Sequence, residues 1–233
     1  MASKPASSAG SGNSSSNSPI KYYLFAYNFS MALGWSYVLI QLILCYAQGK
    51  GPEQAYNCVK TSLQIWQTGA VLEVLHSLLG FVRSPVGSTI VQVTSRIYVL
   101  WSVCYVFEQV RISPVFSSMV AAWCCAEIPR YMWYAINLFS PPPKALTFVR
   151  YSGFLVLYPV GAGSEIVLTI MSLPLQKTVE PVPFVYYICI AALICYVPGL
   201  PYMYYYMLKQ RRKVLASSAP SAPSAPSAPS APS

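Results

Sequence analysis

The chain has 233 residues, of which 55% are hydrophobic and only 9% are charged. Soluble globular domains carry about a quarter of charged residues, so this composition excludes an ordinary soluble enzyme and indicates a polytopic membrane protein. The net charge of +9 does not point to nucleic acid, because the basic residues form no stripe interleaved with aromatic residues on a soluble face.

Residues 1–20 are polar and low in complexity, without the apolar core of a cleavable leader, so we expect a disordered segment there. Six apolar stretches follow, each close to the roughly 20 residues that a helix needs to cross a bilayer: 22–47, 61–82, 87–109, 114–138, 147–172 and 183–208. Their connections are short and rich in Gly and Pro. The predicted fold is an all-α integral membrane bundle of six transmembrane helices over residues 21–213, followed by a disordered Ser/Ala/Pro repeat over residues 214–233.

The basic residues predict the orientation of this bundle. One side of a six-span arrangement collects positive charge without acidic residues, and its members are Lys4, Lys21, Arg83, Lys144, Arg150, Lys209, Arg211, Arg212 and Lys213. Cytosolic loops are enriched in Lys and Arg. We therefore expect this side, and with it both termini, to face the cytosol.

A small set of polar side chains remains at membrane depth once the loop charges are removed: Glu73, His76, Gln92, Arg96, Glu127, Arg130, Tyr158 and Glu165. Ionisable residues inside a membrane are costly and indicate a functional site by default. The alternative is structural pairing, with Glu127 bound to Arg130 and Glu73 bound to Arg96 between helices; for Glu127 we favour that alternative. Pro129 would bend its helix and turn Arg130 inward, so the sequence leaves Arg130 open between substrate clamp and structural partner.

The segment RYSGFLVLYPVGAGSE, residues 150–165, is the most informative stretch. Its Tyr158 and Glu165 are seven residues apart, which places the phenol and the carboxyl on one helix face, about 10 Å apart along the axis. Pro159 and Gly161 loosen the helix beside them and allow a close approach. We interpret the pair as acid–base groups; the alternative is that each only binds a neighbouring helix.

Several enzyme classes are excluded by their ligand requirements. Glu73 and His76 have the Glu-x-x-His spacing of a diiron site, but such a site needs two of these motifs and the chain contains one histidine. No zinc ligand set, phosphate-binding Gly-rich loop or serine nucleophile elbow is present, and the seven cysteines show no metal-binding spacing. We therefore expect none of these metal sites.

The combination of six spans, LEVLHSLLGFVRSP at residues 72–85, Gln92 with Arg96, AEIPRY around Arg130, and residues 150–165 resembles the very-long-chain (3R)-3-hydroxyacyl-CoA dehydratases. This family is also called protein-tyrosine-phosphatase-like or PASTICCINO type. The phosphatase-like name comes from a Cys-x-x-Gly-x-x-Arg string in its members. Here the matching positions are Ser77, Gly80 and Arg83, so the thiolate of a tyrosine phosphatase is absent. The resemblance covers roughly residues 20–213.

The resemblance implies an endoplasmic reticulum enzyme that removes water from a 3-hydroxyacyl-CoA in fatty acid elongation, with Tyr158 and Glu165 as its catalytic pair. It also implies that no metal and no redox cofactor is needed. Which of the two is the base stays open. Supporting or substrate-pocket residues would be Glu73, Gln92, Arg96, Arg130 and Gly161. Candidates for the CoA phosphates are Arg83, Lys144 and Arg150 at the cytosolic rim.

Expected partners are membrane lipid and the other enzymes of the cycle, a condensing enzyme and two reductases. A small transporter is the main alternative from another class, because buried charges and a Pro/Gly-interrupted helix also build transport paths. A non-catalytic scaffold of the elongation enzymes is the third possibility.

Overall fold

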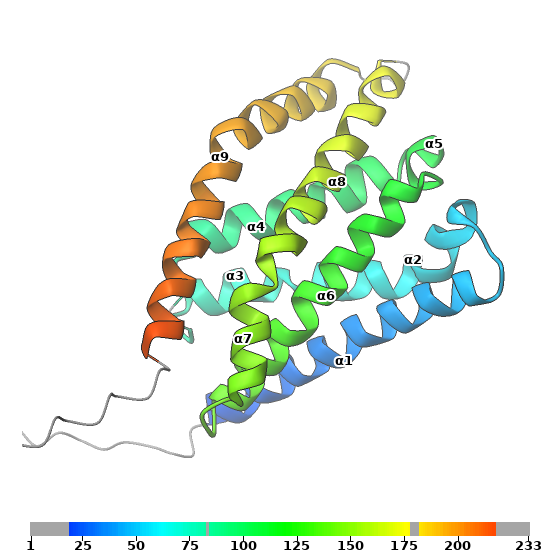
Figure 1. Ribbon diagram of the computed structural model, residues 1–233. Helices are drawn as coiled ribbons and strands as arrows, with labels where there is room; N and C mark the ends of the chain where they lie inside the picture. The colour runs from blue at the N-terminus through cyan, green and yellow to red at the C-terminus, as the bar shows by residue number, and fades with distance from the viewer. Residues whose placement is uncertain (1–18, 83, 178–181, 218–233) are drawn as a thin grey trace, which may run out of the picture.

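The computed structural model describes residues 19–82, 84–177 and 182–217, and every regular element in these residues is helical (Figure 1). The elements in chain order are α1 (Pro19–Ala47), α2 (Pro52–Gly69), α3 (Val71–Leu78), α4 (Val86–Tyr98), the π-helical η1 (Val99–Cys104), α5 (Glu108–Arg111), α6 (Pro114–Asn137), α7 (Lys144–Ser152), α8 (Phe154–Gln176) and α9 (Val182–Ser217). The expected all-helical fold is confirmed for the described part of the chain. The segments expected to be disordered, residues 1–20 and 214–233, lie mostly outside the described residues. The exceptions are Pro19 and Ile20, which are helical in α1, and residues 214–217, which are helical in α9.

Within the described residues, the longer elements form six rods, and each predicted apolar stretch lies largely in one of them. The rods are α1, α2 with α3, α4 with η1, α6, α7 with α8, and α9. Three stretches are long and apolar enough to cross a membrane: Pro19–Ala47, Lys144–Gln176 and Tyr186–Leu215. The first and last described helices start and end, respectively, at the same end of the bundle (Figure 1).

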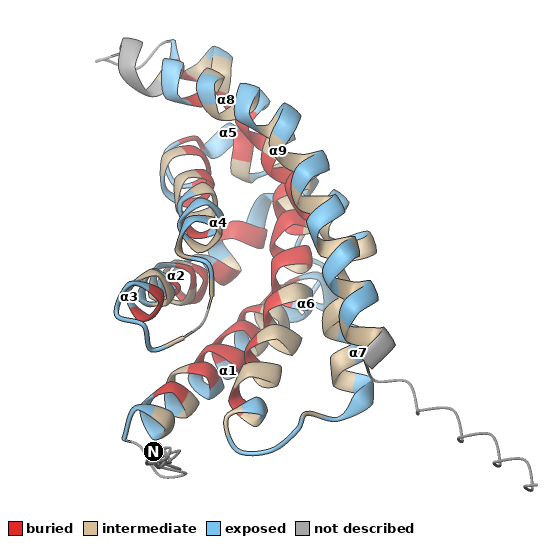
Figure 2. Cartoon of the chain, turned by 90° about the vertical axis from the view of Figure 1, so that its left-hand side faces the viewer, coloured by how far each residue is buried: buried red, intermediate tan, exposed pale blue. Residues whose placement is uncertain are grey.

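The helix α6 lies at the centre and packs against both α1 and α8. Ser113 caps its first turn by accepting a hydrogen bond from Val115 N at 3.3 Å, and Pro114 occupies a position where no backbone donor is needed. The core consists of large side chains such as Trp35, Phe116 and Trp123, and α6 provides many of them. In Figure 2 the buried residues gather on the facing sides of α1 and α6, while α9 is mostly exposed or half-buried.

Two of the rods are interrupted where the sequence predicts continuous spans. Ala70 separates α2 from α3, and Gly153 separates α7 from α8. Pro129, in contrast, does not interrupt α6, which continues through it to Asn137. Pro159 likewise lies inside the continuous α8.

The phosphatase-like string lies at the end of α3, where it terminates the helix. Gly80 has φ of +72°, a backbone conformation that a side chain disfavours. The amide of Phe81 binds the carbonyl of His76 at 2.9 Å, and that of Gly80 binds the carbonyl of Ser77 at 3.2 Å. This bond pair is the Schellman motif of a helix C-terminus. The Ser77 hydroxyl donates to the carbonyl of Ser84 at 2.9 Å, and this hydrogen bond joins the end of α3 to the segment that precedes α4.

Candidate active site

The helices α7 and α8 run antiparallel to α9, and three side-chain contacts hold them in one register, the first from α7 and the other two from α8. Ser152 accepts a hydrogen bond from Arg211 at 3.1 Å, Tyr158 stacks on Tyr204 with ring centroids 6.2 Å apart, and Glu165 binds Tyr196. From one contact to the next, the chain advances six and then seven residues along α7 and α8, and it goes back seven and then eight residues along α9. Tyr158 and Glu165 therefore both lie on the face of α8 that meets α9.

Glu165 is buried, with 6% of its surface exposed, and both of its carboxyl oxygens have a donor. The indole N–H of Trp123 on α6 donates to Oε1 at 2.8 Å, and the hydroxyl of Tyr196 on α9 donates to Oε2 at 2.7 Å. Hydrogen bonds to a carboxylate are stronger than those between neutral groups. The carboxyl group is thus fixed between two neighbouring helices.

Tyr158 is half-buried, and its ring packs against α9 through Tyr204. Phe154, one turn earlier on α8, contacts the same Tyr204 ring at 5.7 Å. Among the described residues, no hydrogen bond is formed by the Tyr158 hydroxyl, in contrast to the hydroxyl of Tyr196. Within the described residues, the hydroxyl of Tyr158 therefore keeps its capacity to form a hydrogen bond with a bound molecule.

Gly161 faces α6 from α8. A methyl group at this position would lie 3.6 Å from Ala122 Cβ and 3.9 Å from Trp123 Cδ1, which is ordinary van der Waals contact. The packing of α8 on α6 at this point therefore has room for a methyl group and does not itself require glycine.

A partly buried ion-pair cluster joins α3, α4 and α6 and consists of Glu73, Arg96, Glu127 and Arg130, of which Glu127 is fully buried. Arg130 donates from both terminal nitrogens to Glu73, at 2.8 and 2.7 Å, and from Nε to Glu127 at 2.6 Å. Arg96 pairs with the other oxygen of Glu127. The predicted Glu127–Arg130 pair is confirmed, whereas the predicted Glu73–Arg96 pair is wrong, because α6 supplies Arg130 to Glu73 and Glu127 to Arg96.

The donors of Arg130 are taken by two carboxylates in the described structure, which is the arrangement expected of a structural partner. The side chains of Tyr131 and Tyr134 add aromatic contacts, with the guanidinium carbon 4.3 and 5.6 Å from their ring centroids. The Tyr131 hydroxyl also donates to Glu73. Two carboxylates and two guanidiniums balance in charge, which offsets the cost of burying them.

Trp123 connects the ion-pair cluster to Glu165. The guanidinium carbon of Arg96 lies 5.3 Å from the centroid of the Trp123 ring, within the range of a cation–π contact. Arg96 thus binds Glu127 on one side and lies over Trp123 on the other. Gln92, one turn before Arg96 on α4, is exposed and takes no part in the cluster.

The basic rim residues differ in their surroundings. Lys144 is exposed at the start of α7, and Arg83 lies outside the described residues. Arg150 is packed among aromatic rings, with its guanidinium carbon 4.3 Å from the centroid of Trp133 and 4.2 Å from that of Tyr134. It also donates to the backbone carbonyl of Arg130 at 3.3 Å. These contacts anchor α7 against α6.

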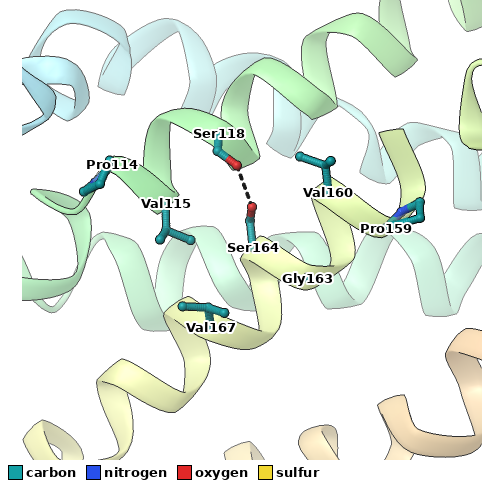
Figure 3. A pocket seen from close by; sticks show the side chains of 8 residues that line it. All are labelled: Pro114, Val115, Ser118, Pro159, Val160, Gly163, Ser164 and Val167. Atoms are coloured by element: carbon teal, nitrogen blue, oxygen red, sulfur yellow. Dashed lines mark hydrogen bonds between the residues drawn. The ribbon is translucent and has the colours of Figure 1, made fainter. Parts of the chain in front are cut away.

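An open groove of about 500 Å³ lies between α6 and α8, on the side of α8 that carries Val160 and Val167 (Figure 3). Ser118 and Ser164 form a hydrogen bond of 2.8 Å in it. Neither Tyr158 nor Glu165 is among its lining residues. The described residues contain no group of three or more His, Cys, Asp and Glu side chains arranged to hold a metal ion.

Sequence reasoning missed Trp123 and Tyr196. Trp123 had a usable signal, because Trp123, Glu127 and Tyr131 follow one another at intervals of four on α6 and so share one helix face. Tyr196 had none, because it is one of many tyrosines on α9 and only the register of α9 on α8 selects it.

Comparison with known proteins agrees with the resemblance found in the sequence. The family model described as "Protein tyrosine phosphatase-like protein, PTPLA" matches residues 67–217, which is more than half of the chain. A very-long-chain (3R)-3-hydroxyacyl-CoA dehydratase of Caenorhabditis elegans is 35% identical over 86% of this chain and 97% of its own length. The Arabidopsis thaliana protein named very-long-chain (3R)-3-hydroxyacyl-CoA dehydratase PASTICCINO 2 is 39% identical, over 85% of this chain and 95% of its own length.

The very-long-chain (3R)-3-hydroxyacyl-CoA dehydratase 2 of Homo sapiens is 33% identical over 83% of this chain and 81% of its own length. No solved structure matches this chain. Because the family model and these relatives cover most of the helical core, including α6, α8 and α9, the chain belongs to the protein-tyrosine-phosphatase-like family of very-long-chain (3R)-3-hydroxyacyl-CoA dehydratases.

Proposed function

We propose that this protein removes water from a (3R)-3-hydroxyacyl-CoA to give a trans-2-enoyl-CoA, with Tyr158 and Glu165 as its acid–base pair. The names of its relatives give the reaction class. The observation that carries the assignment to residues is the buried Glu165 carboxyl, held by two donors on the same face of α8 as the unbonded Tyr158 hydroxyl.

The reaction needs two groups of opposite function on either side of a two-carbon unit. One removes a proton from C2 and the other protonates the hydroxyl that leaves C3 as water. Tyr158 and Glu165 are separated by two helical turns, about 10 Å along the axis, so long side chains reaching toward each other leave room for the reacting carbons between them. The chemistry moves only protons and water, and the pair supplies both groups.

The thioester oxygen gains negative charge as the C2 proton leaves, and a nearby positive charge would stabilise it. Of the two arginines predicted for this role, Arg96 is the better placed, because its guanidinium lies over Trp123, the direct partner of Glu165. Arg130 is farther along the cluster and bound by Glu73 and Glu127. We therefore assign Arg96 the electrostatic role and Arg130 a structural one. Gln92, exposed one turn away on the face of Arg96, would contact the bound substrate.

The CoA moiety would lie at the end of the bundle that carries the start of α7. Lys144 is an exposed cation there, and Arg83 would join it. The aromatic surroundings of Arg150 favour a packing role for this residue over a phosphate contact. Lys144→Glu should raise the KM more than it lowers kcat, and an unchanged KM would remove Lys144 from the CoA site.

We further propose six membrane spans over residues 21–213 with both termini in the cytosol, in the endoplasmic reticulum membrane. The three apolar stretches support a membrane protein, and the common end of α1 and α9 fits an even number of crossings. The partners in this setting would be membrane lipid, a condensing enzyme and two reductases that act on the same CoA chain.

The test is water elimination from a long-chain (3R)-3-hydroxyacyl-CoA by the detergent-purified protein, in comparison with Tyr158→Phe and Glu165→Gln. Each variant should lose at least about 100-fold in kcat, the usual contribution of a general acid or base, while its thermal unfolding stays close to that of the unmodified protein. A folded, unmodified protein without activity at several chain lengths would contradict the proposal and favour a scaffold or transport role.

A further inference from the structure

The geometry points to Trp123 and Tyr196 as positioning residues that hold Glu165 as the base of the dehydration, an inference that rests on the function proposed above. Neither residue belongs to the Tyr158–Glu165 pair, and they come from different helices, α6 and α9. Together they occupy both oxygens of the one buried carboxyl group on the α9-facing side of α8.

The two partners differ in what they allow. An indole N–H only donates, so Trp123 fixes Oε1 of Glu165 as an acceptor. A phenolic hydroxyl both donates and accepts. Tyr196 therefore donates to Oε2 of the carboxylate and, after Glu165 has taken up a proton, accepts from the resulting carboxylic acid at the same place. The contact survives both states of a base.

Trp123 is itself held in place. It is 1% exposed and belongs to the hydrophobic core of the bundle. The guanidinium carbon of Arg96 lies 5.3 Å from the centroid of the Trp123 ring. Arg96 is in turn fixed by Glu127. This chain of contacts orients the indole N–H toward Glu165 and places the charge of Arg96 over the indole ring.

Charged and titratable groups lie on each helix that packs against α8 and on α4. From α6 and α4 these are Glu127, Arg130 and Arg96, which bind one another. From η1 it is Cys104, within electrostatic reach of Glu165, and from α9 it is Tyr196. On α5, Arg111 lies over Tyr56 and near Glu108. On α7, Arg150 faces Trp133, and on α8 itself the neighbouring group is Tyr158.

This arrangement separates the roles of the catalytic pair. Glu165 takes the proton from C2, the electrons of that C–H bond form the C2–C3 double bond, and the C3–O bond breaks. Tyr158, whose hydroxyl is not bound within the described residues, gives its proton to the departing hydroxyl, which leaves as water. Proton transfer from Glu165 to the Tyr158 phenolate, directly or through water, then restores both groups, so no oxidant, reductant or further reactant is needed.

The experiment measures kcat and KM from pH 5 to pH 9 for the unmodified protein, Tyr196→Phe and Trp123→Phe. Each variant removes one hydrogen bond to a charged group, and kcat should fall about 10- to 100-fold with KM changed less than about threefold. The acidic limb of the kcat/KM profile should also change position, because each variant removes a donor from the carboxyl group that acts as the base.

Matched controls are Tyr205→Phe, which removes an exposed hydroxyl from the same helix, and Trp101→Phe, which removes an indole bound to Thr68 at 3.1 Å. Both should retain the unmodified profile. An unmodified protein without dehydratase activity would refute the proposed function. An active protein whose Tyr196→Phe variant keeps the unmodified kcat and acidic limb, or loses activity equally at every pH, would refute the positioning role.

Discussion

Arg130 on α6 binds Glu73 on α3 through both terminal guanidinium nitrogens, at 2.8 and 2.7 Å. This bidentate geometry joins two helices that are distant in sequence, and the Nε atom of the same guanidinium binds Glu127 at 2.6 Å. A planar fork of donors is required for this arrangement, which lysine does not offer.

Arg130→Met should destabilise the protein by about 3–5 kcal/mol, because Glu73 loses its arginine and Glu127 keeps only Arg96. Thermal unfolding of the detergent-purified variant measures this change. Glu108→Gln is the control, since the Glu108–Arg111 pair spans 3.9 Å and Glu108 is 73% exposed; it should leave the unfolding temperature nearly unchanged. Equal effects of the two substitutions would contradict the assigned role.

Gly34→Leu should disrupt the packing of α1 on α2, because the ring of Trp66 occupies the position where a side chain would begin. We expect a loss of about 1–3 kcal/mol, partly restored by the additional change Trp66→Ala. Gly163→Ala on α8 serves as the control, since nothing lies within 4 Å of the added methyl group. It should be neutral or slightly stabilising in the free energy of unfolding, because glycine disfavours a helix interior.

Gly80→Ala should destabilise the end of α3 by about 1–2 kcal/mol, because it forces a side chain into a backbone conformation with φ of +72°. Gly80→Asn should cost less, because asparagine tolerates this conformation better. Gly87→Ala, with open space around the added methyl group, is the matched control. A stable Gly80→Ala variant in a thermal unfolding assay would show that the Schellman motif is dispensable.

Arg96→Met should lower the dehydratase kcat by about 10-fold or more, because it removes the charge over Trp123 and one partner of Glu127. Steady-state kinetics on protein of confirmed fold measures the effect. Arg111→Met is the control, since Arg111 also lies over an aromatic ring, 4.5 Å from the centroid of Tyr56, and belongs to α5. Its kcat should stay within about twofold; a parallel fall in both variants would indicate a packing effect.

Much of the architecture was predictable from single residues and their spacing. The apolar stretches predicted the rods, because a run of about 20 apolar residues has few stable arrangements other than a helix. The seven-residue spacing predicted that Tyr158 and Glu165 share a face, and the contacts with Tyr204 and Tyr196 confirm it. Four of the eight polar residues that the sequence singles out, Glu73, Arg96, Glu127 and Arg130, form one cluster.

The pairing within that cluster was beyond the sequence. Either Arg96 or Arg130 could have paired with Glu73 on sequence grounds. Arg130 does so, because the rotation of α3, α4 and α6 against one another decides which arginine reaches Glu73. The helix breaks at Ala70 and Gly153 were likewise not predictable from the sequence, because packing against neighbouring helices decides whether a helix continues through such a position. Pro129 shows the reverse, as α6 passes through it intact.

The sequence by itself determined the membrane character, the helical rods and the catalytic candidates, because these follow from composition and from the helical period of one segment. The tertiary structure alone decided that Trp123 and Tyr196 hold Glu165, because these contacts join residues 42 and 31 positions apart in the chain. Spacing along a helix fixes which side chains share a face. Which face meets which helix is set by the packing of the whole bundle.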